Sequence, residues 1–186
     1  MKKLQVAIFI SGRGSNLESL IQSSFTKQSL VEVQLVVSNN SKAKGLTIAK
    51  KNKIPFIHFI PRKNFESKVM KYLKNIDIIC LAGFMQVLDS KFVRQWRSRL
   101  INIHPSYLPA FKGLNAQDQA IKAEASYSGC SVHYVSAKID SGKIILQKKV
   151  KILKKDNTES LSKKILIEEH KVCLLYTSDA ADEQWS

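Results

Sequence analysis

The sequence has no long apolar run, few cysteines and half as many acidic as basic side chains. No apolar stretch approaches the roughly 18–20 residues needed to cross a bilayer. The start of the chain, MKKLQVAIFISGRG, lacks the small-residue cleavage site that ends a signal peptide. We therefore expect a cytoplasmic protein that has no membrane partner.

Cysteine is scarce and badly spaced for cross-linking or metal binding. Cys80, Cys130 and Cys173 are odd in number, far apart in the chain, and include no C-x-x-C pair. This pattern argues against a disulfide framework and against a zinc site, so we expect no bound metal.

Acidic residues are also few, with 15 Asp and Glu against 30 Lys and Arg. Of the net charge of +15, the first hundred residues carry +13. The excess is spread over several segments without an Arg-rich run, which suits a solvated surface, and it suits attraction of an anionic small molecule as well as nucleic acid. The 44% of apolar residues is typical of a globular chain with one sizeable core.

Apolar runs rich in Val and Ile alternate with amphipathic stretches along the chain. We expect strands at 5–10, 32–38, 55–59, 76–81, 100–104, 130–135 and 144–150. We expect helices at 16–23, 42–51, 64–74, 90–96, 115–122 and 158–170. Continuous hydrophobicity in strands that alternate with helices predicts an α/β fold with an open, mostly parallel twisted sheet and helices on both faces. Ligands of such sheets bind beyond the carboxyl ends of the strands.

The first candidate site is Ser-Gly-Arg-Gly-Ser-Asn at 11–16, between the first strand and the first helix. Glycines there permit a tight turn, and the helix start offers unpaired N–H groups to a phosphate. Leu17 replaces the third glycine of a dinucleotide-binding fingerprint, and the Gly-Lys-Ser/Thr of a Walker loop is missing. The two readings left are a phosphate monoester site and a plain tight turn.

The second candidate site lies at the end of the fifth strand, in Asn-Ile-His-Pro-Ser-Tyr-Leu-Pro. Residues two apart in a strand share a face, so Asn102 and His104 are expected to project together. An amide that donates to an oxyanion beside an imidazole that holds a proton is a catalytic pairing.

Asp140, in a polar turn between the last two strands, is either an ordinary turn residue or a third member of this site. If it reaches His104, its charge is expected to favour the imidazolium and to raise the histidine pKa. The sequence has no G-x-S-x-G elbow, and this favours direct transfer between bound substrates over a covalent intermediate.

The fourth strand runs into the apolar loop Leu-Ala-Gly-Phe-Met-Gln-Val-Leu at 81–88. Its backbone N–H and C=O groups, bordered by apolar side chains, suit a flat heteroaromatic ring.

At these positions the sequence closely resembles the phosphoribosylglycinamide formyltransferases, a family of purine-pathway enzymes with the formyltransferase fold and a Rossmann-like amino-terminal half. The matching segments are VAIFISGRGSNLESLI, LAGFMQVL, INIHPSYLP, GCSVHYVSAKIDSGKIILQ and EEH. The family transfers a formyl group from 10-formyltetrahydrofolate to the amine of N1-(5-phosphoribosyl)glycinamide. The resemblance implies this reaction, with those small molecules as partners, no nucleic acid, no metal, and a monomer or homodimer.

The resemblance also implies roles for individual residues. Asn102, His104 and Asp140 match the catalytic residues. The ribonucleotide-binding residues that it implies are Gly12, Gly14, Ser15, Asn16 and Glu169. The folate-binding residues that it implies are Lys68, where the family usually has Arg, together with Met85, Gln86, Val87, Leu88 and Asn102. His133, on the adjoining strand, has either a supporting or a structural role.

The chain departs from the family at three places. Lys112 stands where the family often has Pro, and Asn115 where it often has His. After Lys171 the family continues with an apolar helix, whereas this chain soon runs into SDAADEQWS. We therefore expect one formyltransferase domain over residues 1–171 and an atypical tail over 172–186 that resembles a foreign or out-of-frame ending.

Three alternatives remain at the sequence level. Methionyl-tRNA formyltransferase shares the fold and the site, but this chain has no room for its RNA-binding domain. Formyltetrahydrofolate deformylase normally carries an additional amino-terminal domain. A basic nucleotide- or RNA-binding module gives no reason for the three catalytic residues to converge, and it predicts strongly salt-dependent RNA binding.

Overall fold

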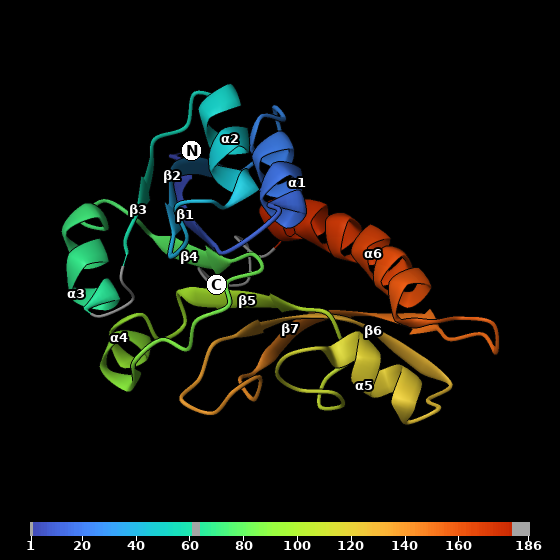
Figure 1. Ribbon diagram of the computed structural model, residues 1–186. Helices are drawn as coiled ribbons and strands as arrows, with labels where there is room; N and C mark the ends of the chain where they lie inside the picture. Colours follow the sequence, from blue (N-terminus) through green and yellow to red (C-terminus); the bar gives the residue numbers. More distant parts are fainter. Residues whose placement is uncertain (1, 61–63, 180–186) are drawn as a thin grey trace.

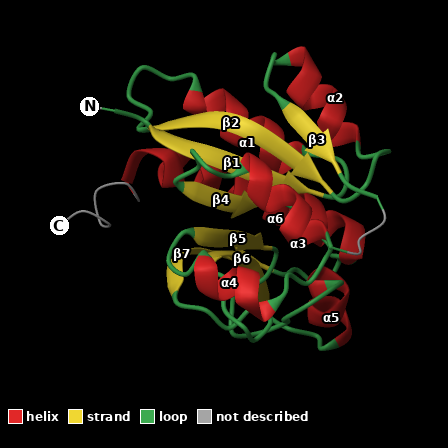
Figure 2. Ribbon diagram, turned by 90° about the vertical axis from the view of Figure 1, so that its left-hand side faces the viewer, coloured by secondary structure: helices red, strands yellow, loops and turns green. Residues whose placement is uncertain are grey.

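A computed structural model describes residues 2–60 and 64–179 of the chain. Its centre is a seven-stranded sheet with the strand order β3-β2-β1-β4-β5-β6-β7, flanked by helices (Figures 1 and 2). The first five strands in that order pair in parallel, whereas β6 runs antiparallel to β5 and β7 antiparallel to β6. The predicted α/β class and mostly parallel sheet are confirmed.

All the predicted strands and helices are present; β5 has the predicted ends, and each of the other elements is shifted at one end or both. The strands are β1 Leu4–Ile10, β2 Val31–Ser38, β3 Phe56–His58, β4 Ile78–Leu81, β5 Leu100–His104, β6 Tyr127–Tyr134 and β7 Ile144–Lys151. The helices are α1 Ser15–Ser24, α2 Lys44–Lys51, α3 Phe65–Val69, α4 Ser90–Gln95, α5 Ala116–Lys122 and α6 Thr158–Asp179, with a 3-10 turn at Met70–Tyr72. The single helix expected at 64–74 is therefore two shorter pieces. The strand expected from residue 130 begins at Tyr127, because the start of β6 pairs with the end of β7 in a hairpin.

Each face of the sheet carries its own apolar core, and β1 contributes to both. Val6, Ile8 and Ile10 point to the core under α1, α2 and α6, while Ala7 and Phe9 point to the core under α3 and α4. Side chains of a strand alternate between faces, so burial of both sets requires helices on both sides. This explains why the strand sequence is continuously hydrophobic.

The chain reverses its direction of travel across the sheet at β1. It builds β2 and β3 on one side of this strand and then returns to place β4 on the other. The loops after β1, β4 and β5 consequently meet at one edge of the sheet, the position where open α/β sheets bind ligands. Two candidates lie outside these loops, Lys68 near the end of α3 and Glu169 in the middle of α6; the other candidate segments lie in or next to the edge that the loops form.

Helix α6 does not end where the sequence pattern predicted. It continues past His170 to Asp179, and Val172 and Cys173 are fully buried in the core beneath it. These two residues pack as part of the domain although the sequence analysis placed them in the tail. Residues 180–186, the last part of the predicted tail, lie outside the described residues.

No helix in the described part of the chain combines the length and the hydrophobicity needed to span a membrane.

Candidate functional site

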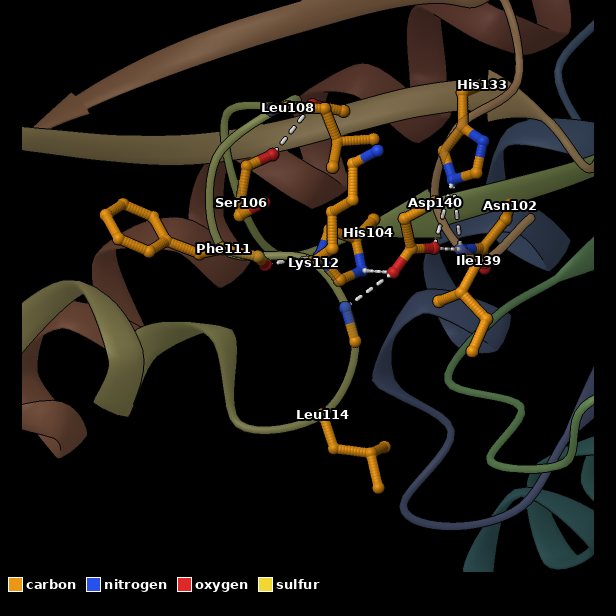
Figure 3. Close-up of polar contacts among 12 residues, drawn as sticks. Asn102, His104, Ser106, Leu108, Phe111, Lys112, Leu114, His133, Ile139 and Asp140 are labelled. Atoms are coloured by element: carbon orange, nitrogen blue, oxygen red, sulfur yellow. Dashed lines mark hydrogen bonds and ion pairs between the residues drawn. The ribbon is translucent and has the colours of Figure 1, made fainter.

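Three of the predicted residues form one hydrogen-bonded group at the carboxyl end of β5 (Figure 3). Asn102 and His104 project from β5, and Asp140 reaches them from the loop between β6 and β7. The Asp140 carboxylate lies 3.3 Å from Nδ1 of His104 and accepts a 3.4 Å hydrogen bond from the Asn102 amide. The sequence predicted this cluster; the structure brings its three members together.

Asp140 is held by donors on several sides. The Gly113 backbone N–H donates to its Oδ2 over 2.8 Å, and Nε2 of His133 lies 3.5 Å from its Oδ1. Burial alone would raise the pKa of this carboxyl. The His133 and Gly113 hydrogen bonds and the charges of His104 and His133 outweigh burial and lower the pKa to about 2. Asp140 is therefore a carboxylate throughout the neutral pH range.

His104 is buried, and both its ring nitrogens face oxygen acceptors. Nε2 lies 2.9 Å from the Phe111 carbonyl oxygen, and Nδ1 faces Asp140. Nε2 must carry hydrogen, because a carbonyl oxygen cannot donate one. Burial lowers the pKa of His104, and the Phe111 carbonyl and Asp140 offset this only partly, while the charge of His133 adds to the lowering.

Asp140 does act to raise the pKa of His104, as expected, but burial has the larger effect and the net shift is downward. The sequence could not reveal how deeply the ring is buried. Because Nε2 carries the hydrogen that faces the Phe111 carbonyl oxygen, His104 gains or loses its second proton at Nδ1, next to Asp140. The lowered pKa makes that proton easier to lose.

His133 belongs to the same group. It lies opposite Asn102 in the β5–β6 pairing, and its Nε2 is 3.2 Å from the Asn102 amide nitrogen. Its Nδ1 is 2.9 Å from the Tyr134 carbonyl oxygen, which fixes the orientation of the ring. His133 thus contacts two of the three predicted catalytic residues, Asn102 and Asp140. Its position in the sequence alone could not distinguish a supporting role in the site from a structural role.

The segment 11–16 forms a glycine turn followed directly by α1. Gly14 has φ +83°, and a Cβ on it would lie 2.6 Å from the Cα of Gly45, so this position requires glycine. Gly12 meets no such restriction, since nothing lies within 4 Å of a Cβ built there. The first paired N–H of the helix is that of Glu18, so the N–H groups of residues 15–17 lie at the open helix end.

Asn16 links this helix start to α6. Its amide donates to Oε2 of Glu169 over 3.1 Å, and its own oxygen is buried with no hydrogen-bond partner among the described residues. Burial raises the pKa of Glu169 to about 7, and the Asn16 hydrogen bond opposes that rise. The structure therefore joins two predicted ribonucleotide-binding residues that are distant in sequence.

The loop after β4 is tied to the glycine turn. Its Met85 N–H donates to the Ser11 hydroxyl over 2.7 Å, and Ser11 in turn donates to Asn39. Asn39 donates to Gln86 over 3.3 Å. Met85 and Val87 expose their side chains, whereas Leu88 is buried in the core under α3 and α4. The loop thus offers two apolar side chains to a ligand, and Leu88 anchors it.

Lys68 lies on α3, and among the described residues its ammonium group makes no ion pair. None of its contacts links it to the Asn102, His104 and Asp140 group, so the sequence-based assignment to folate binding stays a prediction.

Sequence reasoning missed the turn at 111–114, which supplies Phe111 O to His104 and Gly113 N–H to Asp140. Backbone groups leave no residue-type signal apart from the glycine itself. Lys112, one of the departures from the family pattern, donates from its ammonium group to the Ser141 hydroxyl next to Asp140 (2.5 Å), so it bridges this turn to the Asp140 loop.

No cluster of three or more His, Cys, Asp or Glu side chains that could hold a metal ion occurs within residues 2–60 and 64–179.

Comparison with known proteins agrees with this geometry. The formyl transferase family model matches residues 4–177. Phosphoribosylglycinamide formyltransferase of Haemophilus influenzae is 36% identical over 92% of this chain and 84% of its own length. The trifunctional purine biosynthetic protein adenosine-3 of Bos taurus is 43% identical, and the chain spans only 18% of that longer protein.

Solved structures give the same relation. Phosphoribosylglycinamide formyltransferase from Anaplasma phagocytophilum superimposes with a TM-score of 0.90 at 42% identity, over 98% of this chain and 88% of that one. Glycinamide ribonucleotide transformylase 1 from Symbiobacterium toebii gives a TM-score of 0.93 at 34% identity, over 97% and 89% of the two chains. Because the family model matches nearly the whole described chain and these relatives align over most of it, the chain belongs to the formyl transferase family.

Proposed function

We propose that this protein transfers the formyl group of 10-formyltetrahydrofolate to the primary amine of N1-(5-phosphoribosyl)glycinamide, as a step of purine biosynthesis in the cytoplasm. The products are the N-formyl ribonucleotide and tetrahydrofolate. The observation that carries the proposal is the contact of Asn102, His104 and Asp140 at the edge of the sheet where α1 also begins with open N–H groups.

Asn102 suits the role of oxyanion donor. Attack of the amine on the formyl carbon turns the carbonyl oxygen into an alkoxide, and an amide N–H held in place stabilises that charge without reorganisation. Its amide nitrogen already lies within 3.4 Å of Asp140 and 3.2 Å of His133, so its orientation is fixed before substrate binds. One such donor contributes a factor of about 10²–10³ in rate.

His104 and Asp140 suit the movement of the proton. The attacking nitrogen becomes an ammonium group in the intermediate and must lose a proton, while the folate nitrogen must gain one when the carbon–nitrogen bond breaks. In its neutral form, the buried His104 can take up the first proton at Nδ1 and return it to the leaving nitrogen, with water as the relay. Asp140 is a weak base because its pKa is about 2, so it stabilises the transient imidazolium and does not keep the proton.

The opposite end of the site suits the ribonucleotide. The open N–H groups of residues 15–17 and the positive end of the α1 dipole favour a phosphate monoester. Asn16 has a buried oxygen free to accept a hydrogen bond, and Glu169 beside it can accept or donate according to its protonation. The net charge of +15 favours encounter with two anionic substrates.

The proposed folate site is assigned from the family resemblance and from the exposed loop at Met85–Leu88. Exposed Met85 and Val87 offer apolar contact, and the backbone of the loop offers hydrogen bonds to a heteroaromatic ring. Lys68 is proposed to contact the acidic tail of the folate.

The test is an assay of the full chain with 10-formyltetrahydrofolate, with and without the ribonucleotide, following tetrahydrofolate. We expect product only when both substrates are present. Product formed at the same rate without the ribonucleotide would indicate a deformylase, and no product with both would refute the proposal.

A further inference from the structure

The turn at Phe111–Leu114 sets the geometry of the His104–Asp140 pair through its backbone. The Phe111 carbonyl oxygen lies 2.9 Å from Nε2 of His104, and the Gly113 N–H donates to Asp140 over 2.8 Å (Figure 3). These two backbone groups lie two residues apart. A shift of the turn therefore moves the partners of both side chains at once.

The turn has an unfavourable backbone conformation for its sequence. Phe111 has φ +55°, Gly113 φ +78° and Asn115 φ +56°. Left-handed backbone angles suit glycine, are tolerated by Asn, and are disfavoured for a bulky residue such as Phe. Interactions outside the turn must hold it in place.

Gln119 supplies two such interactions from α5. Its side-chain amide donates to the Lys112 carbonyl oxygen over 3.0 Å and to the Leu114 carbonyl oxygen over 2.9 Å. These carbonyl groups alternate with the two backbone groups that face His104 and Asp140. Helix α5 is itself anchored, because Ala116 and Ala120 on either side of Gln119 are buried.

We propose that Gln119 is a positioning residue for formyl transfer: its amide clamps the turn at 111–114 and so aligns His104 with Asp140. It does not touch the reacting atoms. The inference deepens the proposed function and rests on it.

The clamp also has an electrostatic consequence. The charged groups that face His104 are Asp140 and His133, and the Phe111 carbonyl oxygen accepts from its ring. The Phe111 contact raises the pKa of His104, and the Gly113 N–H lowers the pKa of Asp140. Both contacts favour the ion pair, so release of the turn is expected to lower the pKa of His104 further and to raise that of Asp140.

The first test is Gln119→Met, which keeps the length of the side chain and removes the donors. We expect kcat to fall about 10- to 100-fold, because small displacements of catalytic groups cost that much. The KM for the ribonucleotide should stay unchanged, since its proposed phosphate site lies on α1. Gln95→Met, at an exposed position of α4, is the matched control and should behave as the wild type.

The second test separates clamping from simple packing. Gln119→Glu has the same size, but a carboxylate cannot donate to two carbonyl oxygens, so kcat should fall at least as far as in Gln119→Met. Titration of the His104 ring by NMR should give a lower pKa in Gln119→Met than in the wild type; the charge added in Gln119→Glu acts in the opposite direction, so the uncharged variant is used for this measurement. Wild-type kcat in both variants together with an unchanged His104 pKa in Gln119→Met would overturn the proposal.

Failure of the proposed function is distinguishable from failure of this inference. An inactive wild type would refute the formyl transfer, while the NMR titration of His104 would still test the clamp. An active wild type with normal Gln119 variants would refute the clamp alone.

Discussion

Two buried carboxyl groups at the ligand-binding side of the sheet have pKa values shifted in opposite directions. Asp140 has a pKa lowered to about 2, and Glu169 a pKa raised to about 7. Burial opposes ionisation of both. Asp140 is surrounded by a backbone N–H and two histidines, whereas Glu169 has the single amide of Asn16. Burial therefore decides the sign for Glu169, which is the more deeply buried of the two, whereas the hydrogen bonds and charges around Asp140 outweigh burial.

The difference separates two regions of the site by task. The proposed catalytic region consists of Asn102, His104, His133 and Asp140, and it keeps a carboxylate beside a histidine, which suits proton movement. The proposed ribonucleotide region, residues 11–16 with Glu169, keeps a carboxyl that changes protonation near neutral pH, which suits hydrogen bonding to a ligand. Changes in the catalytic region should alter kcat, and changes in the ribonucleotide region should alter KM.

The largest effect is expected for Asp140→Asn. The substitution keeps the shape but removes the charge that stabilises the His104 imidazolium and leaves the Gly113 N–H facing a weaker acceptor. We expect kcat to fall at least about 10³-fold, by analogy with the loss of the carboxylate in other catalytic groups. Steady-state kinetics with a thermal unfolding control measures this, and near-normal kcat in a folded variant would remove Asp140 from the mechanism.

Asn102→Ala should have the next largest effect. Loss of the oxyanion donor is expected to lower kcat about 10²–10³-fold with little change in the KM for the ribonucleotide. A higher KM with an unchanged kcat in this variant would show that Asn102 acts in substrate binding. That result would contradict the assignment of different tasks to the two regions.

In the ribonucleotide region, Gly14→Ala should impair binding where Gly12→Ala does not. A Cβ at position 14 conflicts with Gly45 and with the left-handed backbone, so the helix start must move away from the phosphate. We expect the KM for the ribonucleotide to rise about tenfold or more, as expected when contacts worth about 1–2 kcal/mol are lost. Gly12→Ala is the control, because its added methyl meets open space, and equal effects of the two substitutions would contradict this account.

Glu169→Gln should have the smallest kinetic effect and a clear effect on the pH dependence of stability. The folded-state pKa of about 7 lies above the ordinary 4.5, so the folded protein holds this proton more tightly than the unfolded chain. The stabilisation is full below about pH 4.5 and is lost as pH rises through 7. The variant should lose this dependence between pH 5 and 7 in denaturant titrations, and should raise the KM about two- to tenfold. An unchanged pH dependence would show that Glu169 has an ordinary pKa in the folded state.

The sequence predicted the sheet class and the convergence of Asn102, His104 and Asp140, because strand patterns and face sharing follow from local residue order. It did not predict the pKa of His104, since the sign depends on burial by distant segments. The clamp of Gln119 was also out of reach, because its partners are backbone carbonyl groups that any residue supplies. The continuation of α6 past Lys171 was missed because the polar end of the sequence obscured the burial of Val172 and Cys173.

The most direct test of the division between the two regions compares kcat and the KM for the ribonucleotide in Asp140→Asn and Glu169→Gln, measured side by side with saturating 10-formyltetrahydrofolate. The account predicts a large fall in kcat with little change in KM for Asp140→Asn. For Glu169→Gln it predicts a higher KM with kcat nearly unchanged. A fall in kcat of similar size in both variants would contradict it.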